Sequence, residues 1–435
     1  MASGGETATV LVTGASGYIA AHIIKLLLDE GYKVRGTVRD AQNEAKVKVL
    51  KELCPDATYP LELVEADLLK EDSWKEVVKN CSYVIHTASP FPSTTPANAD
   101  DVIKPAVDGT KNVLQACADA GTVKRVVITS SVAAVHGEMV MEEGKEYTEG
   151  DWTNTESASL DLYSKSKTLA ERAAWDFVKE LPEDKKFELA VINPGLVLGP
   201  VINGAISTSV EIVKKLLERS MPMVPKANFA VCDVRDVALA HLKAMTLSNA
   251  ADHRHIICTQ NVWFKDIALA LSKEFKPHGY SIPTMVAPYF AVWLNSFVDK
   301  MTRTILPRIG REFRFDNKRM REELGITPRE LNQTLIDTAY SLIENGFVKK
   351  SKKYKQNRKD SVAEQKNADA EENAEQTEET EPKEKDEQEK SEDKEEMKEL
   401  EPEDKPEKMI NGMQCRMEMK ASVVSFQNTL PNESF

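Results

Sequence analysis

The stretch "TATVLVTGASGYIAAHIIKLLLDEG", residues 7–31, decides the fold class of this chain. It opens with a short apolar run that ends at a glycine, and apolar residues at helical spacing then continue up to Gly31. This order predicts a strand, a tight turn and a helix. Gly14 permits the turn, and Gly17 lets backbone amides approach an anion at the helix N-terminus, where the helix dipole favours negative charge. Ala20 is small enough for the helix to pack closely on the strand.

Further apolar runs continue the alternation of strand and helix. Helical segments such as "EDSWKEVVKN" and "IKPAVDGTKNVLQACADAG" separate them, and the predicted strands lie within residues 32–38, 61–68, 81–89, 123–131 and 187–195. Alternating strands and helices imply right-handed crossovers, hence a doubly wound, parallel α/β sheet that is covered on both faces. Because such sheets bind ligands beyond the carboxyl ends of their strands, we expect the functional residues to gather there.

Charge divides the 435-residue chain into two parts. Residues 360–408 contain 22 acidic residues and 8 lysines, a net charge of −14, whereas the whole chain carries −13. The remaining residues are thus nearly neutral, which argues against nucleic-acid binding by the globular body. We predict that residues 351–435 form a disordered Glu/Lys-rich tail, because too few apolar groups are present to offset the entropy of ordering. A transient charged helix, a solvating appendage and an acidic arm for a basic partner stay open.

Cysteine spacing and apolar segments limit the remaining possibilities. The six cysteines form no C-x-x-C pair, and the seven histidines show no ligand spacing beside them, so we expect no metal site and a reducing compartment. The opening "MASGGETATV" lacks the regions of a secretory signal, and we expect a cytoplasmic protein. The segment "MVAPYFAVWLNSFV" (285–298) is too short to span a bilayer; we interpret it as a packed helix and pocket wall, with a small lipid-facing role as the alternative.

The end of the second predicted strand indicates which dinucleotide would bind. A carboxylate at this position would bind the ribose diol of NAD and repel a 2′-phosphate. The chain has Arg39 there, and Lys46 follows, so the two cations favour the additional phosphate of NADP(H). Asp40 argues the other way, since it could reach the ribose, and Lys46 could instead belong to a solvated helix face.

Tyr163 opens the helical run "YSKSKTLAERAAWDFV" and is a candidate proton donor. At about 100° per residue, Lys167 lies about 40° from Tyr163 on the helix, whereas Lys165 lies about 200° away. Lys167 is therefore the expected partner, and its ammonium group should lower the pKa of the Tyr163 phenol. A hydroxyl that binds the substrate oxygen is expected at the end of the fifth strand, where Ser130 and Ser131 both qualify.

These motifs together resemble a known family. The T-G-x-x-G-x-x-A turn, the serine pair and the later Y-x-x-x-K resemble the extended short-chain dehydrogenase/reductases. The stretches "TVRDAQNEAK", "HTASPF", "TSSVAAV", "DWTN", "INPGLVLGP" and "DVRDVALAH" narrow the resemblance to the dihydroflavonol reductase-like carbonyl reductases, which include cinnamoyl-CoA reductases and yeast methylglyoxal reductase. The resemblance covers about residues 6–349 and leaves the tail outside.

The resemblance implies an NADPH-dependent reductase of an aldehyde or ketone, with a Rossmann-type domain and a smaller C-terminal substrate lobe, mainly residues 198–230 and 260–330. Ser131 would orient the carbonyl, Tyr163 would protonate it, and Lys167 would tune Tyr163 and hold the nicotinamide ribose. The cofactor contacts predicted from the residues and from the resemblance together are Gly14, Ser16, Gly17, Tyr18, Ile19, Arg39, Lys46, Asp67, Leu68, Thr87, Ala88, Ser89, Tyr163, Lys167, Pro194, Gly195, Leu196, Val197 and Ser209.

Several alternatives stay open from the sequence. His136 replaces an asparagine of the plant flavonoid reductases, which weakens the case for a flavonoid; it is either a substrate contact or a loop residue. Asn112 could join a proton relay or make a structural hydrogen bond, and Asp233 and Asp236 are expected to be structural. Apolar lobe segments favour a small apolar substrate. Rival functions are a nucleotide-sugar epimerase, a 3β-hydroxysteroid dehydrogenase/isomerase, and an NADPH-binding sensor or scaffold without enzymatic activity. The oligomeric state stays open.

Overall fold

A computed structural model describes residues 8–89, 98–138, 142, 144–298, 302–303 and 306–358 of the chain. Its centre is a seven-stranded sheet in which all neighbouring strands are parallel. From one edge to the other, the strands are β3 (Glu62–Glu65), β2 (Lys33–Val38), β1 (Thr9–Thr13), β4 (Tyr83–His86), β5 (Arg125–Thr129), β7 (Glu188–Pro194) and β10 (Arg254–Ile257). This order, with β1 and β4 adjacent at the centre, confirms the predicted doubly wound Rossmann-type sheet.

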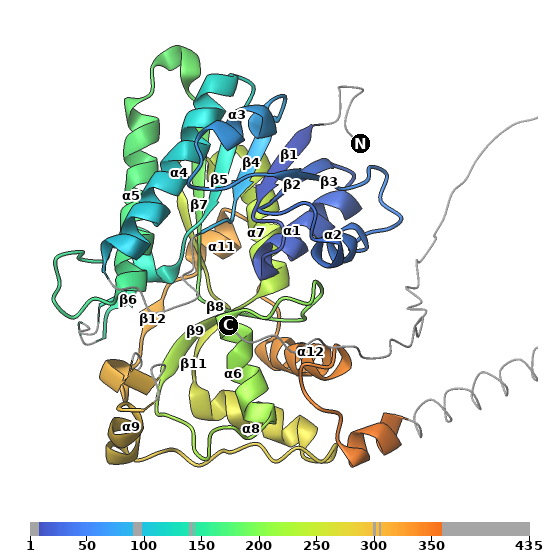
Figure 1. The fold of residues 1–435 in the computed structure, drawn as a ribbon. Helices are drawn as coiled ribbons and strands as arrows, with labels where there is room; N and C mark the ends of the chain where they lie inside the picture. The colour runs from blue at the N-terminus through green and yellow to red at the C-terminus, as the bar shows by residue number, and fades with distance from the viewer. Residues whose placement is uncertain are drawn as a thin grey trace, which may run out of the picture. The chain divides into compact units, whose positions relative to one another are not determined.

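Helices cover both faces of the sheet, as Figure 1 shows. One face carries α1 (Tyr18–Asp29) and α7 (Val234–Thr246), and the other carries α3 (Asp72–Val78), α4 (Asp100–Ala120) and α5 (Leu162–Glu180). Neighbouring residues of β1 alternate between the two cores: Val10 and Val12 pack with α1 and α7, and Leu11 packs with α3, α4 and α5. The short helix α2 (Glu44–Lys51) buries only Leu50.

The smaller lobe is built on a second sheet, drawn below the first in Figure 1. This sheet contains β8 (Leu196–Leu198), β9 (Asn228–Asp233) and β11 (Gln260–Trp263), with β9 in the middle. Helices α6 (Thr208–Leu217), α8 (Phe264–Phe275) and α12 (Leu331–Glu344) share one apolar core with it. The short elements β6 (Glu146–Tyr147), β12 (Arg314–Phe315), α9 (Tyr289–Asn295) and α11 (Lys318–Glu322) complete the described body.

The short connection that follows β8 is held from two directions. The Tyr18 hydroxyl at the start of α1 donates to the Gly199 carbonyl at 2.9 Å, and Asn203 Nδ2 donates to the Ser16 carbonyl at 3.0 Å. On the opposite side, the Gly199 amide donates to Thr338 Oγ1 of α12 at 2.7 Å. The entry into the lobe is therefore fixed both to the glycine turn after β1 and to the last long helix of the body.

The segment 285–298 differs from its prediction as a packed helix. Helix α9 covers only part of it, and most of its large side chains are exposed, with Phe290 at 65 % and Trp293 at 47 %. Val292 and Ser296 are the buried residues of this segment. Apolar composition alone did not distinguish a core helix from a surface helix here. In the described ranges, no helix combines the length and the apolarity that a membrane span requires.

The globular body extends past the predicted start of the tail. Residues 352–358 are helical, and Tyr354 within them is buried in the core of the lobe. The Tyr354 hydroxyl donates to Glu344 Oε1 at 2.6 Å, which ties this last turn to α12. The described body thus includes residues 351–358 of the predicted tail, and the remainder of that tail, 359–435, lies outside the described residues.

Candidate active site

A cleft of about 570 Å³ opens where β1, β2, β4, β5 and β7 end, as expected for a parallel sheet. It brings together nearly all of the predicted site residues, although they come from separate loops and helices. The predicted residues that line it are Gly14, Ser16, Gly17, Tyr18, Ile19, Arg39, Asp67, Leu68, Thr87, Ala88, Ser89, Ser131, Tyr163, Lys167, Pro194, Gly195, Val197 and Ser209. Lys46 and Leu196 are the two that do not.

The glycine turn after β1 has room only for glycine at its critical position. Gly14 has a φ of +69°, and a Cβ there would stand 3.1 Å from Ala88. A Cβ on Gly17 would lie 3.1 Å from the Gly14 carbonyl oxygen. Helix α1 begins directly afterwards, and Gly17 offers no capping side chain, so the first amides of the helix can bind an anion instead.

The two predicted phosphate-binding cations lie in different places. Arg39 is exposed at the rim of the cleft, whereas Lys46 is exposed on α2 and does not line it. The Asp40 carboxylate accepts a hydrogen bond from the Gln42 amide at 2.9 Å and is not among the residues that line the cleft. Arg39 is thus the charged side chain best placed to select between the two dinucleotides.

The structure distinguishes the two serines that the sequence left open. Ser130 Oγ donates to Glu171 Oε2 at 2.5 Å and is therefore engaged by a buried carboxylate. Ser131 Oγ accepts from the Ala133 amide at 3.2 Å and also interacts with the Tyr163 hydroxyl. Ser131 is the hydroxyl that shares the cleft with the candidate proton donor.

Tyr163 and Lys167 lie on one face of α5. Asp161 caps this helix, which places Tyr163 in its first turn, at the mouth of the cleft. Lys167, one turn further, also lines the cleft, and its Nζ lies 3.5 Å from the Thr129 carbonyl oxygen. Lys165 does not line the cleft. The angular argument from the sequence therefore agrees with the arrangement of the helix.

The electrostatics of the pair differ from our expectation that Lys167 lowers the pKa of Tyr163. Although 44 % of Tyr163 is exposed, its phenol is enclosed enough for burial to raise its pKa, and the contact with Ser131 offsets part of this effect. Burial also lowers the pKa of Lys167 to about 8, while the negative charge of Glu171 acts in the opposite direction. Tyr163 therefore carries its proton at neutral pH, as a donor must.

A buried polar network behind these residues was not predicted. The Glu171 side chain is fully buried and accepts hydrogen bonds from Ser130, from Asn193 Nδ2 at 2.8 Å and from Arg254 Nε at 2.6 Å. Arg254 also donates to the Asp151 carbonyl at 2.6 Å. The available signal was the spacing of Glu171, one turn after Lys167 on the same helix. The network joins α5, β5, β7 and β10 beneath the cleft.

His136 lies outside the cleft. Its ring stacks on Tyr147 with a centroid distance of 3.9 Å and lies 5.9 Å from Phe313. Burial lowers its pKa to about 4, so it is neutral at pH 7. These contacts describe a packed aromatic residue and give no support to a substrate contact.

The other residues that the sequence left open make structural contacts. Asn112 Nδ2 donates to the Leu68 carbonyl at 2.8 Å, which holds the loop after β3. Asp233 caps α7 and accepts from Thr334 Oγ1 at 2.7 Å, and Asp236 accepts from a backbone amide at 2.8 Å. Each carboxylate thus fixes the packing of α7 against the C-terminal part of the body.

The fold and the composition of the cleft define a dinucleotide-binding enzyme. The chain belongs to the NAD dependent epimerase/dehydratase family, whose model matches residues 10–258. It is 36 % identical to cinnamoyl-CoA reductase 2 of Medicago truncatula, over 80 % of this chain and 94 % of that protein. It is 35 % identical to an anthocyanidin reductase of Vitis vinifera, over 63 % of this chain and 83 % of that protein.

A solved structure leads to the same group of enzymes. The yeast methylglyoxal/isovaleraldehyde reductase Gre2, crystallised with NADPH, matches with a TM-score of 0.66 and 32 % identity, over 78 % of this chain and all of that one. These relatives confirm the predicted resemblance to the dihydroflavonol reductase-like branch and the prediction of an oxidoreductase.

Replacement of Lys167 by alanine should lower kcat/KM by about 100-fold or more, because the cleft loses the cation that lies one helical turn from the proton donor. The matched control is Lys165→Ala on the same helix, which should change kcat/KM less than about threefold because Lys165 does not line the cleft. Steady-state kinetics of both variants test this. Equal losses would contradict the assignment of Lys167.

Proposed function

We propose that this chain is an NADPH-dependent reductase of small, mainly apolar aldehydes and ketones. The observation that carries the proposal is the convergence of Ser131, Tyr163 and Lys167 on the cleft that also contains the glycine turn. Two hydroxyls and a cation at the end of a dinucleotide site are what the reduction of a carbonyl group requires. The names of the relatives, which are reductases of aldehydes, thioesters and flavonoids, support the same reaction class.

The residues present suit NADP(H). Gly14, with a φ of +69°, makes the tight turn, and Gly17 has no side chain that caps α1, so a pyrophosphate can approach the first amides of the helix. Arg39 at the rim offers a planar guanidinium for the 2′-phosphate. When bound, NADPH supplies the hydride for the carbonyl carbon.

The side chains of the chain supply the rest of the reaction. Ser131 and Tyr163 hold the carbonyl oxygen between their hydroxyls, and Tyr163 donates its proton to that oxygen as the alcohol forms. The positive charge of Lys167 stabilises the resulting tyrosinate, because an opposite charge nearby favours the ionised phenol. The Glu171 network holds Ser130 and thereby fixes the backbone from which Ser131 projects.

The preference for a compact substrate is supported by the lobe side of the cleft. Val197, Ser207 and Ser209 line it there, an apolar side chain with two small hydroxyls. The segment 285–298, which we expected as a second wall, does not line the cleft and contributes nothing to this preference. Lys214, on the outer part of α6, pairs with Glu218 at 2.8 Å and leaves the cleft without an anion clamp from this helix.

The test is NADPH consumption by the purified full-length chain with a panel of carbonyl compounds. Isovaleraldehyde, methylglyoxal and phenylacetaldehyde should be reduced, with differences of about 1–3 kcal/mol per methylene in the free energy of activation. Turnover of cinnamoyl-CoA alone would agree with the proposed reductase activity but would contradict the proposed compact substrate. Turnover of UDP-glucose with none of the simple carbonyls would assign the chain to the epimerases.

Replacement of Arg39 by alanine should raise the KM for NADPH about 10-fold or more and leave the KM for NADH nearly unchanged, since only NADPH has the phosphate that the guanidinium binds. Lys46→Ala is the matched control, because Lys46 is exposed and lies off the cleft. The measurement is the KM of each cofactor at a saturating aldehyde. If Arg39→Ala changed the KM for NADPH and the KM for NADH by similar factors, Arg39 would not be the residue that selects the cofactor.

A further inference from the structure

A cluster of two histidines and a glutamate lies away from the cleft, and its geometry is that of a metal site. We propose that His253, His255 and Glu323 bind a divalent transition-metal ion, with Zn²⁺ as the representative ion. The sequence predicts no metal site from its cysteines, because no histidine lies at ligand spacing beside them. The signal was the H-x-H spacing, and the carboxylate that completes it comes from a distant part of the chain.

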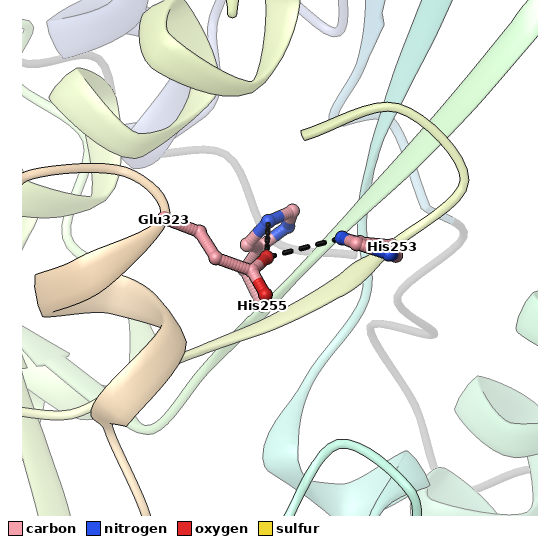
Figure 2. Close-up of side chains that lie close together, drawn as sticks. All are labelled: His253, His255 and Glu323. Carbon is pink, nitrogen blue, oxygen red and sulfur yellow. Dashed lines mark hydrogen bonds and ion pairs between the residues drawn. The ribbon is translucent and has the colours of Figure 1, made fainter. Parts of the chain in front are cut away.

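The cluster is assembled by two elements. His253 directly precedes β10 and His255 lies within it, and residues two apart on a strand face the same side. Arg254 between them faces the opposite side, toward Glu171. Glu323 directly follows α11, which packs on this side of β10. Figure 2 shows the Glu323 carboxylate pointing to the space between the two imidazole rings.

The distances suit coordination of one ion. Glu323 Oε2 lies 3.1 Å from His253 Nδ1 and 3.3 Å from His255 Nε2, and one ligand atom from each residue lies within 4.8 Å of the others. Bonds of about 2.0–2.1 Å to a tetrahedral Zn²⁺ place neighbouring ligand atoms about 3.3 Å apart. Small side-chain rotations would therefore bring all three groups to one ion, with a fourth position left for water.

His255 provides a second, independent indication. Its side chain is 0 % exposed, and neither ring nitrogen has a hydrogen-bond partner of normal geometry within the described residues, although the Val191 backbone lies near the ring. Buried imidazoles are normally satisfied, because an unpaired buried polar group costs free energy. Its Nε2 lies 3.3 Å from Glu323 Oε2, but the two atoms do not form a hydrogen bond of normal geometry. Two ligands of one ion also lie close together without a hydrogen bond between them.

The other oxygen of Glu323 is held by a second residue. Glu323 Oε1 lies 3.4 Å from Arg319 Nε, so that Oε2 alone faces the imidazoles. Ligating carboxylates in metal sites commonly have such outer partners. The positive charge of the Arg319 guanidinium would repel a bound metal ion and lower the affinity of the site for it. The affinity is also limited because the protein supplies three ligands instead of four. The site is therefore expected to be weaker than a closed structural zinc site.

The position of the cluster indicates a structural role for the ion. His253 lies at the amino end of β10, whereas the cleft lies at the carboxyl ends of the strands. An ion here would join the edge strand of the sheet to α11. Bound Zn²⁺ should thus stabilise the folded chain and leave the chemistry in the cleft unchanged.

The experiment is a titration of the full-length chain with Zn²⁺, followed by calorimetry and by the melting temperature. The variants are His253→Ala, at a half-exposed position that tolerates truncation, and Glu323→Gln. Their matched controls are His278→Ala, outside the cluster, and Glu322→Gln, the exposed neighbour of Glu323. All proteins retain the acidic residues 360–408, so weak binding there is common to every curve.

We expect one Zn²⁺ per chain and a higher melting temperature for the unaltered chain and both controls. His253→Ala and Glu323→Gln should each weaken this binding by at least about 100-fold, since even an outer partner of a metal ligand contributes about 10- to 100-fold. Mg²⁺ should not compete, because it prefers oxygen ligands. Identical curves for all five proteins, or no rise in melting temperature, would overturn the proposal and leave the cluster as an ion-paired group.

Discussion

Tyr163→Phe is expected to lower kcat by about 10²- to 10⁴-fold, the usual contribution of a positioned general acid, while NADPH binds with nearly the same affinity. The substitution removes only the hydroxyl that interacts with Ser131 and keeps the ring at the mouth of the cleft. The measurements are single-turnover reduction of the best aldehyde from the panel and a fluorescence titration with NADPH.

The two readouts separate a chemical role from a structural one. If Tyr163→Phe lost NADPH binding as strongly as turnover, Tyr163 would be part of the binding surface rather than the proton donor. If turnover changed less than about tenfold, another group would have to supply the proton. Ser131→Ala, which removes the other hydroxyl, should also lower kcat and leave cofactor binding intact.

Arg254→Met is expected to lower the free energy of unfolding by about 3–5 kcal/mol, because it leaves the Glu171 carboxylate buried without its cation. Methionine retains much of the length and apolar surface of the arginine, so the loss reports on the charge together with the hydrogen bonds of Arg254 to the Glu149 and Asp151 carbonyls. Denaturant unfolding of the variant measures it.

The double variant Arg254→Met/Glu171→Gln should recover part of this loss, because glutamine can still hydrogen-bond Ser130 and Asn193 without a buried charge. Arg314→Met is the matched control: Arg314 forms an exposed pair with Glu312, and its removal should leave stability nearly unchanged. A similar effect of Arg254→Met and Arg314→Met would show that the buried network contributes little.

The sequence predicted the sheet and the cleft because both depend on local patterns. Each buried strand is a short apolar run, and several cleft residues follow such a strand closely, so that strand order and chain position together locate Gly14, Thr87 and Ser131. The pairing of Tyr163 with Lys167 followed from helix geometry alone, because both residues belong to one continuous helix.

The remaining features depend on contacts between distant segments. Ser130 differs from Ser131 only through Glu171, which the fold brings near. The sequence around Phe290 is as apolar as that of a core helix, yet Phe290 is exposed. Only tertiary packing decides which face of α9 is covered. The partner of His255 is likewise supplied by another element after folding.

The double anchoring of the connection after β8 has a consequence for synthesis on the ribosome. Tyr18, the first anchor, is translated directly after β1, whereas Thr338 belongs to α12, which follows every strand of the main sheet. The strands of the main sheet emerge while α12 is still untranslated, and domains generally fold as their residues become available. The nascent chain therefore holds a nearly complete nucleotide-binding half before the connection after β8 can bind α12. Translation of α12 supplies the bond from Thr338, so the connection after β8 is fixed on both sides only after all strands of the main sheet have been translated.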